Sequence, residues 1–216
     1  YHLAAEQGDA DAQNSLGYMY QNGEGVTKDY KEAEKWYRLA TKQGDAGAQF
    51  NLGVMYQAGY GVTKDYQEAL KWFRLAAEQG LAESQFNLGQ MYVKGQGVTQ
   101  DYKEATKWWR LAAEQGDVEA QYNLGVMYSQ GEGPTQDYKE AAKWYRLAAA
   151  QGFVEAQYNL AVMYVFGQGV IKNHVVAHMW TNIAARNGHE AAKKSRDFLA
   201  KKMKPKQIAK AKELAR

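Results

Sequence analysis

One pair of histidines has a residue type and a spacing that could support metal chemistry. His174 and His178 stand four residues apart, which places two imidazoles on one face of a helix, and His189 follows further along. Two such imidazoles can bind a transition-metal ion if other ligands complete the set. No acidic or cysteine residue is spaced to do so, and His174 takes a position held by tyrosine earlier in the chain. We therefore expect neither a metal site nor a cofactor.

Nucleophilic catalysis lacks its sequence signatures. The Ser-x-x-Lys motif of serine β-lactamases is missing after each serine of the chain, namely Ser15, Ser84, Ser129 and Ser195. Esterase, zinc-protease, phosphate-loop and dinucleotide motifs are also missing. The chain has no cysteine, which excludes disulfides, thiolate metal sites and cysteine nucleophiles. The sequence predicts a protein that is not an enzyme.

Asparagine and aromatic residues recur side by side and form the candidate partner-binding site. The candidate residues are Phe50, Asn51, Val54, Phe86, Asn87, Tyr122, Asn123, Val126, Tyr158 and Asn159, with Val162, Val165 and Phe166 nearby. A side-chain amide offers donors and an acceptor, which suits binding to a peptide backbone. Exposed aromatic residues in a row are unusual unless they contact something. The alternative is structural: the aromatic residues belong to the core between repeats, and the asparagines bond to turn backbones. The sequence leaves both open.

These residues belong to a repeat with a period of 36 residues. Glycine marks it at Gly8, Gly44, Gly80, Gly116, Gly152 and Gly188. Tryptophan follows it at Trp36, Trp72, Trp108, Trp144 and Trp180, and leucine at Leu16, Leu52, Leu88, Leu124 and Leu160. Periods of about 20–50 residues are typical of stacked arrays, in which each unit buries its apolar face against its neighbours.

Two helices are predicted in each unit, shown here for residues 9–44. The first begins after Asp9, a suitable N-cap, and ends at Gly23, where a left-handed residue is needed. The second begins after Asp29, with Glu32 three residues later as a capping-box partner.

Small residues facing large ones predict how the two helices pack. Gly17 is expected to allow a close helix crossing, since a glycine inside a helix otherwise costs about 1 kcal/mol. Tyr20 and Trp36 are expected to fill the space between helix pairs. By the same pattern, Trp108 in the central repeat is predicted to be largely buried between units.

The Leu-Gly-x-x-Tyr motif of the first helix resembles that of tetratricopeptide repeats, whose period is about 34 residues. The connector Gly-x-Gly-Val-x-x-Asp and the motifs Ala-x-x-x-Leu-Gly-x-Met-Tyr and Ala-x-x-Trp-[Tyr/Phe/Trp]-Arg-Leu-Ala instead resemble the bacterial type of Sel1-like repeat. The resemblance covers essentially the whole chain. It implies an all-α fold, a right-handed superhelical solenoid of helix-turn-helix repeats, with the candidate residues on its concave face.

The same resemblance implies a protein-protein interaction module or adaptor that binds a peptide or a partner protein on that face. The alternatives are a scaffold that binds a cell-wall fragment or another polymer and, less favoured, a hydrolase. Some cysteine-rich relatives carry a β-lactamase annotation, which the missing Ser-x-x-Lys motif argues against. The absence of cysteine favours a periplasmic or secreted protein over a cytoplasmic one without excluding either.

We expect a repeat array over residues 1–187, a partial unit followed by five full repeats, and a basic helical cap over residues 188–216. The segment from Gly188 onward contains ten basic and three acidic residues, which gives it a net charge of +7, whereas the whole chain has a net charge of +3. The cap lacks the interleaved aromatic residues of single-strand binders, so no nucleic acid is expected. Pro205 is expected to open a last helix that folds back over the fifth unit. No stretch is long and apolar enough to span a membrane, and a monomer is expected.

Overall fold

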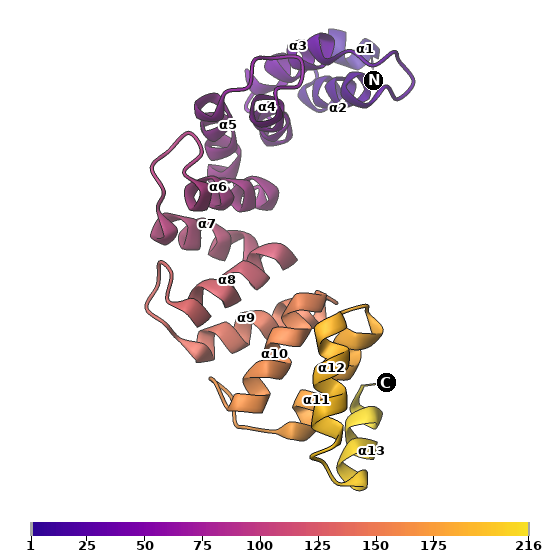
Figure 1. Ribbon diagram of the computed structural model, residues 1–216. Coiled ribbons are helices and arrows are strands. Elements are labelled where there is room, and N and C mark those ends of the chain that lie inside the picture. Colours follow the sequence, from indigo (N-terminus) through magenta and orange to yellow (C-terminus); the bar gives the residue numbers. More distant parts are fainter. Residues whose placement is uncertain (1, 216) are drawn as a thin grey trace. The chain divides into compact units, whose positions relative to one another are not determined.

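The computed structural model describes residues 2–215, which form 13 α-helices and no strand, and Figure 1 shows their order. Tyr1 and Arg216, the latter counted above among the cap cations, lie outside the described residues. The helices are α1 (His2–Glu6), α2 (Ala10–Asn22), α3 (Tyr30–Thr41), α4 (Ala46–Ala58), α5 (Tyr66–Glu78), α6 (Ala82–Lys94), α7 (Tyr102–Glu114), α8 (Val118–Gln130), α9 (Tyr138–Ala150), α10 (Val154–Phe166), α11 (His174–Arg186), α12 (Glu190–Ala200) and α13 (Pro205–Leu214). The predicted all-α fold of helix-turn-helix units is confirmed.

The helices form two compact units, Tyr1–Gln115 and Gly116–Arg216. The first holds the helix pairs α2–α3, α4–α5 and α6–α7, and the second holds α8–α9 and α10–α11 with the two C-terminal helices. Within a unit, the second helix of one pair also packs on the first helix of the next, as α3 does on α4 and α9 on α10. Within each compact unit, successive helix pairs thereby cover one another's apolar faces.

The helix ends follow the predicted capping chemistry. Asp9 accepts a hydrogen bond from the amide of Ala12 at 2.7 Å, and Asp29 accepts from two amides at the start of α3. Gly23 adopts a φ of 77°, a left-handed conformation that ends α2 without a Cβ clash. Leu81 and Phe153 take the place of the capping aspartate before α6 and α10 and make no side-chain cap.

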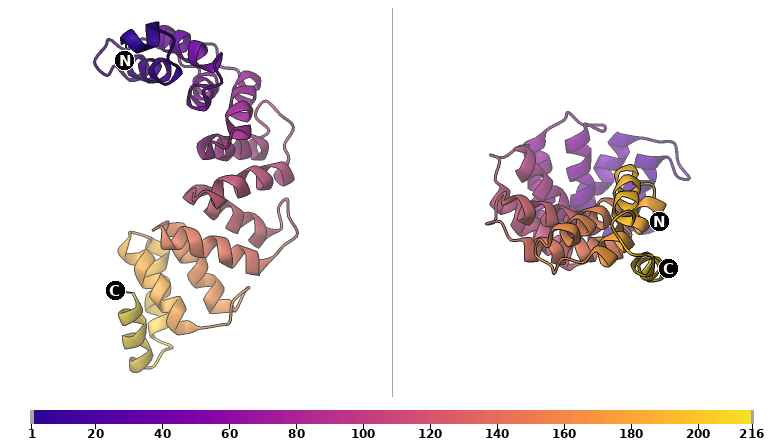
Figure 2. Two further views of the ribbon diagram at one scale, coloured as in Figure 1. Left: turned by 180° about the vertical axis from the view of Figure 1, so that it is seen from behind. Right: turned by 60° about the horizontal axis from the view of Figure 1, so that its bottom comes forward.

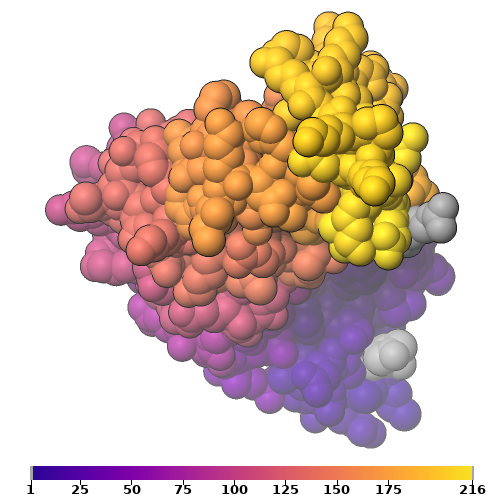
Figure 3. Space-filling view, turned by 90° about the horizontal axis from the view of Figure 1, so that it is seen from below, coloured from indigo at the N-terminus to yellow at the C-terminus, as the bar shows by residue number. Residues whose placement is uncertain are grey.

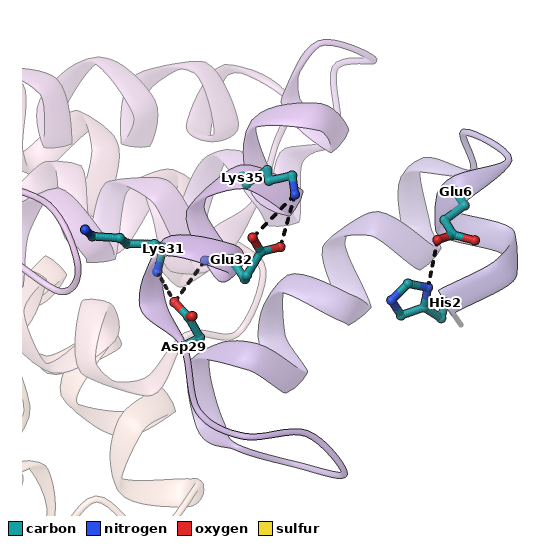
Figure 4. Close-up of polar contacts among 6 residues, drawn as sticks. All are labelled: His2, Glu6, Asp29, Lys31, Glu32 and Lys35. Carbon is teal, nitrogen blue, oxygen red and sulfur yellow. Dashed lines mark hydrogen bonds and ion pairs between the residues drawn. The ribbon is translucent and has the colours of Figure 1, made fainter.

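The capping box expected at α3 forms only in part. Asp29 caps the amides of Lys31 and Glu32, but Glu32 turns to the ammonium group of Lys35, 3.2 Å away (Figure 4). The Asp29 amide instead donates to the carbonyl of Tyr20 at 2.9 Å. The connector brings a carbonyl from the last turn of α2 close to the start of α3, and both helix ends gain a partner from one bond.

Glycine and a ring face each other inside the helix pairs. A Cβ on Gly17 would lie 2.7 Å from the ring of Tyr37, and a Cβ on Gly125 would lie 2.5 Å from the ring of Tyr145. Gly53 and Gly89 meet rings in the same way. The predicted close crossing is confirmed, because only glycine leaves room for the ring.

Trp36 is buried, as expected, but Trp108 is only partly buried. The buried indole of the central repeat is its neighbour Trp109, which is 5% exposed and donates to the carbonyl of Phe86 at 3.1 Å. The prediction for Trp108 is therefore corrected. In the central repeat the residue that faces the mid-helix glycine is therefore the more deeply buried of the two, whereas in the fourth repeat Trp144 and Tyr145 are both buried.

Glutamine side chains connect each repeat to the turn that precedes it. The sequence patterns did not indicate this network. Gln13 is buried on α2 and donates to the carbonyl of Ala5 at 3.1 Å. Gln43 donates both to Gln13, at 3.0 Å, and to the carbonyl of Gly8, at 2.9 Å. The pairs Gln79–Gln49, Gln115–Gln85 and Gln151–Gln121 repeat the side-chain bond.

The C-terminal helices cover the fifth helix pair. Both α12 and α13 pack on α11, and Ala177, Leu199, Met203 and Ala211 form their shared core. Figure 2 shows these helices side by side, and Figure 3 shows the C-terminal residues in yellow against the orange fifth pair. Pro205 lies in the first turn of α13. The expectation that the last helix folds back over the fifth unit is confirmed.

Candidate binding site

The ten candidate residues lie on first helices of the repeats, α4, α6, α8 and α10, and all of them are half-buried. The half-burial of these side chains follows from the geometry of the repeat. Each first helix points its leucine and glycine residues into the core, and the candidate residues lie on the neighbouring strip of the helix, at the edge of the core.

The aromatic candidates pack one face on a ring in the same compact unit. Phe50 lies on Phe73 with ring centroids 5.8 Å apart, and Tyr122 lies on Tyr145 at 5.9 Å. Phe86 stacks on Trp109 at 6.3 Å in the same way. These side chains therefore support the core, as the structural interpretation has it, and remain partly accessible at the surface.

Three of the four asparagine candidates, Asn51, Asn87 and Asn159, have partners within the protein. Asn51 donates to Asn14 at 2.9 Å, and Asn87 donates to the carbonyl of Glu83 at 2.8 Å. Asn159 makes side-chain hydrogen bonds with the hydroxyl groups of Tyr122 and Tyr145. An amide has two N–H donors and a carbonyl oxygen, so one bond does not exhaust it. These partners are side chains or a carbonyl within the same helix, not the turn backbones of the structural alternative.

Burial and nearby charge also affect the tyrosines around Asn159. Burial raises the pKa of Tyr122, and the carboxylate of Glu155 raises it further. Burial likewise raises the pKa of Tyr145. Both phenols are therefore neutral hydrogen-bonding groups at neutral pH, and of the two Tyr122 is the one that is only half-buried.

Hollows occur beside these residues at one register of the repeat. A hollow of about 410 Å³ in the first compact unit is lined by Asn14, Tyr18 and Asn51, among others. A hollow of about 310 Å³ in the second compact unit is lined at the same three register positions by Tyr122, Val126 and Asn159. We call the surface formed by these register positions of the first helices, within each compact unit, the first-helix surface.

A third hollow, of about 590 Å³, lies at the C-terminal end of the first-helix surface of the second compact unit. Val162 and Phe166 of α10 line it together with Thr181 of α11 and Phe198 of α12. The sequence patterns had singled out the α10 residues but not Thr181 or Phe198. The signal that could have found them is the change from glycine to Ala161 and from a ring to Thr181 in the fifth repeat.

The histidines do not come together as ligands. His189 accepts from the amide of Ala192 at 3.1 Å, which caps α12, and its ring stacks on Tyr158 at 4.4 Å. His178 is buried against the cap, where burial lowers its pKa. Within residues 2–215, no group of three or more histidine, cysteine or acidic residues could hold a metal ion. The described helices also include none that is long and apolar enough to cross a membrane.

The Sel1 repeat family model matches the chain over residues 10–45, 46–81, 82–117, 118–153 and 154–189. The chain belongs to the Sel1 repeat family. These matched spans begin at the helix pairs described above, and the Sel1 repeat fold is generally a scaffold for protein interactions rather than an enzyme.

Solved structures agree with this membership. A protective antigen present in uropathogenic Escherichia coli strains is 42% identical, with a TM-score of 0.91, over 98% of this chain and 46% of that one. The chain thus spans about half the length of that relative. A Sel1 repeat protein from Oxalobacter formigenes is 38% identical, with a TM-score of 0.79, over 97% of this chain and 86% of that one.

The immunity protein Pa5087 from Pseudomonas aeruginosa shares the fold at 21% identity and a TM-score of 0.52, over 88% of this chain and 73% of that one. No curated protein matches the chain.

Proposed function

We propose that this Sel1 repeat protein is an adaptor whose first-helix surface binds extended peptide segments or loops of a partner protein. The observation that carries the proposal is the return of a hollow at the same register in both compact units. Asn14, Tyr18 and Asn51 line the first, and Tyr122, Val126 and Asn159 line the second.

The chemistry of the surface suits a peptide. Aromatic and valine side chains offer apolar contact, while the amide of Asn87 and the phenol of Tyr122 offer hydrogen bonds to a peptide backbone. A glycan-binding surface would instead present flat aromatic rings as its main contact, and Phe50, Phe86 and Tyr122 each have one ring face covered by a neighbouring ring. The peptide is therefore the ligand that we favour over a cell-wall polymer.

The test begins with a peptide selected on the intact chain from a random displayed library and titrated by calorimetry. Phe86→Ala is expected to weaken binding through lost apolar contact. Asn87→Ala and Asn123→Ala are expected to weaken it by about 0.5–1.5 kcal/mol each, the net value of a hydrogen bond. Lys210→Glu, on the exposed side of α13, is the control and should leave the affinity unchanged.

Circular dichroism should show that every variant keeps the helicity of the parent. Unchanged affinity in all three first-helix variants would contradict the proposal and move the binding site elsewhere on the chain. If a cell-wall fragment binds this surface and no selected peptide does, the ligand is a polymer rather than a peptide.

A further inference from the structure

The hollow at the end of the second compact unit is a changed copy of the hollow before it. Eight of its lining residues stand 36 positions after a lining residue of the 310 Å³ hollow, so the two occupy one register of successive repeats. The end hollow is larger, at about 590 Å³. We call it the end pocket, formed by α10, α11 and α12.

Loss of one ring accounts for the extra space. In the fourth repeat the ring of Tyr145 sits against Gly125, as described above. In the fifth repeat Ala161 and Thr181 hold the same two positions, and both are buried. A methyl group and a threonine side chain fill less volume than a tyrosine ring, and this leaves a pocket beside Tyr158 and Leu199.

The lining of the end pocket is also apolar where the earlier hollow is polar. Ser129 and Gln130 of the earlier hollow correspond to Val165 and Phe166 of the end pocket. Phe166 is 69% exposed and Phe198 is 56% exposed, although both are large apolar side chains. Exposed aromatic residues at the mouth of an apolar hollow are typical of a binding surface.

Two lysines lie beside this apolar pocket. Lys194 lines it, and the ammonium group of Lys202 lies 4.2 Å from the ring centroid of Phe198. Both belong to the segment from Gly188 onward, whose net charge is +7. An approaching segment of negative charge is favoured by this field.

We propose that the end pocket takes one large apolar side chain from an acidic, extended segment of a partner protein. The inference rests on the proposed function and adds the class of sequence that the C-terminal end of the surface selects. The apolar side chain supplies the affinity through burial, and acidic neighbours in the segment face Lys194 and Lys202.

The decisive variant restores the pattern of the earlier repeats. Ala161→Gly combined with Thr181→Tyr rebuilds the glycine–ring pair and should fill the pocket without disturbing the fold. The probe is the peptide acetyl-Asp-Glu-Phe-Glu-Asp-amide, titrated into the full chain and followed by the NMR methyl signals of Val162, Val165 and Leu199. The double variant should weaken binding by about tenfold or more, the loss expected when a large side chain is no longer buried.

Matched probes and variants separate the two parts of the proposal. Replacing the peptide's phenylalanine by alanine should abolish the shifts of the pocket methyl groups. Lys194→Glu should weaken binding of the acidic peptide, whereas Lys206→Glu makes the same charge change on the exposed side of α13, outside the pocket, and should have little effect.

If the double variant folds and binds the acidic peptide as tightly as the parent does, the proposal for the end pocket is wrong. If Phe86→Ala still weakened the library-selected peptide in that case, the general peptide-binding function would stand without it. A second titration uses the fatty acid decanoate. If decanoate shifts the NMR signals of the pocket methyl groups and the peptide does not, the proposal is also wrong, because the occupant is then a fatty acid rather than a protein segment.

Discussion

A buried glutamine side chain forms the hydrogen bonds between a repeat and the turn that precedes it. Gln85 is buried on α6, donates to the carbonyl of Ala77 at 3.1 Å and accepts from Gln115 at 2.8 Å. The Ala77 carbonyl also accepts a hydrogen bond from the backbone amide of Gly80 at 3.0 Å, and a carbonyl oxygen has two lone pairs. The glutamine therefore gives this helix-end carbonyl a second hydrogen bond and joins it to the following repeat.

We predict that Gln85→Leu lowers the free energy of unfolding by about 1–3 kcal/mol, because it removes two hydrogen bonds of a buried side chain, each with a net value of about 0.5–1.5 kcal/mol. Urea denaturation followed by circular dichroism measures the change. Gln67→Leu, the same substitution at an exposed position of α5, is the control and should change stability by less than about 0.5 kcal/mol. Equal stability of both variants would show that the network contributes nothing.

The two tryptophans of the central repeat should differ in energetic weight. Trp109→Ala removes a buried indole and its bond to Phe86, so we expect a loss of about 3–5 kcal/mol. Trp109→Phe should retain most of the stability, because Phe73 fills the equivalent position in the repeat before. Trp108→Ala should cost clearly less than Trp109→Ala in thermal or urea unfolding, and the reverse order would refute the assignment of the core residue.

The glycine–ring pair should show strong coupling. Gly125→Ala alone pushes a methyl group into the ring of Tyr145 and should cost about 1–3 kcal/mol. Tyr145→Thr alone leaves a cavity and should cost about 3–5 kcal/mol. The double variant copies Ala161 and Thr181 of the fifth repeat, and a double-mutant cycle by urea unfolding should find it more stable than the sum of the two losses. Strict additivity would contradict the contact.

At the scale of elements, the C-terminal cap is a helix pair that closes the fifth repeat. The buried side chain of His178 on α11 faces it, with Arg196 and Asp197 of α12 and Lys212 of α13 around the same hollow. Burial lowers the pKa of His178, the two cations lower it further, and Asp197 opposes them. The fold therefore holds this imidazole neutral.

The sign of the pH dependence follows from that lowered pKa. Below about pH 6.5, the ordinary value for histidine, the unfolded chain binds a proton at this position and the folded chain does not, so stability falls as the pH falls. We predict that urea midpoints drop between pH 7 and pH 5 and that His178→Gln reduces this drop. His174→Gln, one turn earlier, keeps the buried His178 and should keep the drop. An identical pH profile for parent and His178→Gln would refute the prediction.

At the scale of the whole molecule, the repeats behave as interchangeable units wherever their contacts follow the same register. Removal of residues 46–81 joins Asp45 to Ala82 and lets α3 pack on α6 in place of α4. Gln85 replaces Gln49 at the junction. Linear arrays gain stability from units and from interfaces between neighbours, so one repeat fewer leaves a folded but less stable chain.

We predict that this deletion variant is a helical protein with the parent's ellipticity per residue and a lower urea midpoint. Circular dichroism and light scattering measure both properties. The matched control removes residues 46–63, half a repeat, which leaves α5 without its first helix and should aggregate or lose helicity. A deletion of one whole repeat that fails to fold would show that the units are not equivalent.

The sequence by itself determined the repeat, its helix pairs and their caps. These features are local and return every 36 residues, so a position such as Asp29 or Gly23 can be interpreted from its neighbours in the chain. The family followed from the same motifs. The candidate surface could also be predicted, because a stripe beside the leucine and glycine stripe must lie at the edge of the core.

Only the tertiary structure decided which side chains meet. A tryptophan at every period pointed to Trp108, yet in the central repeat the ring that faces the mid-helix glycine is that of Trp109, which is buried, while Trp108 is only partly buried. The glutamine network joins residues 30 positions apart, a spacing with no local signature. The end pocket arises because Ala161 and Thr181 change together across a helix pair, and their contact exists only once the two helices are packed.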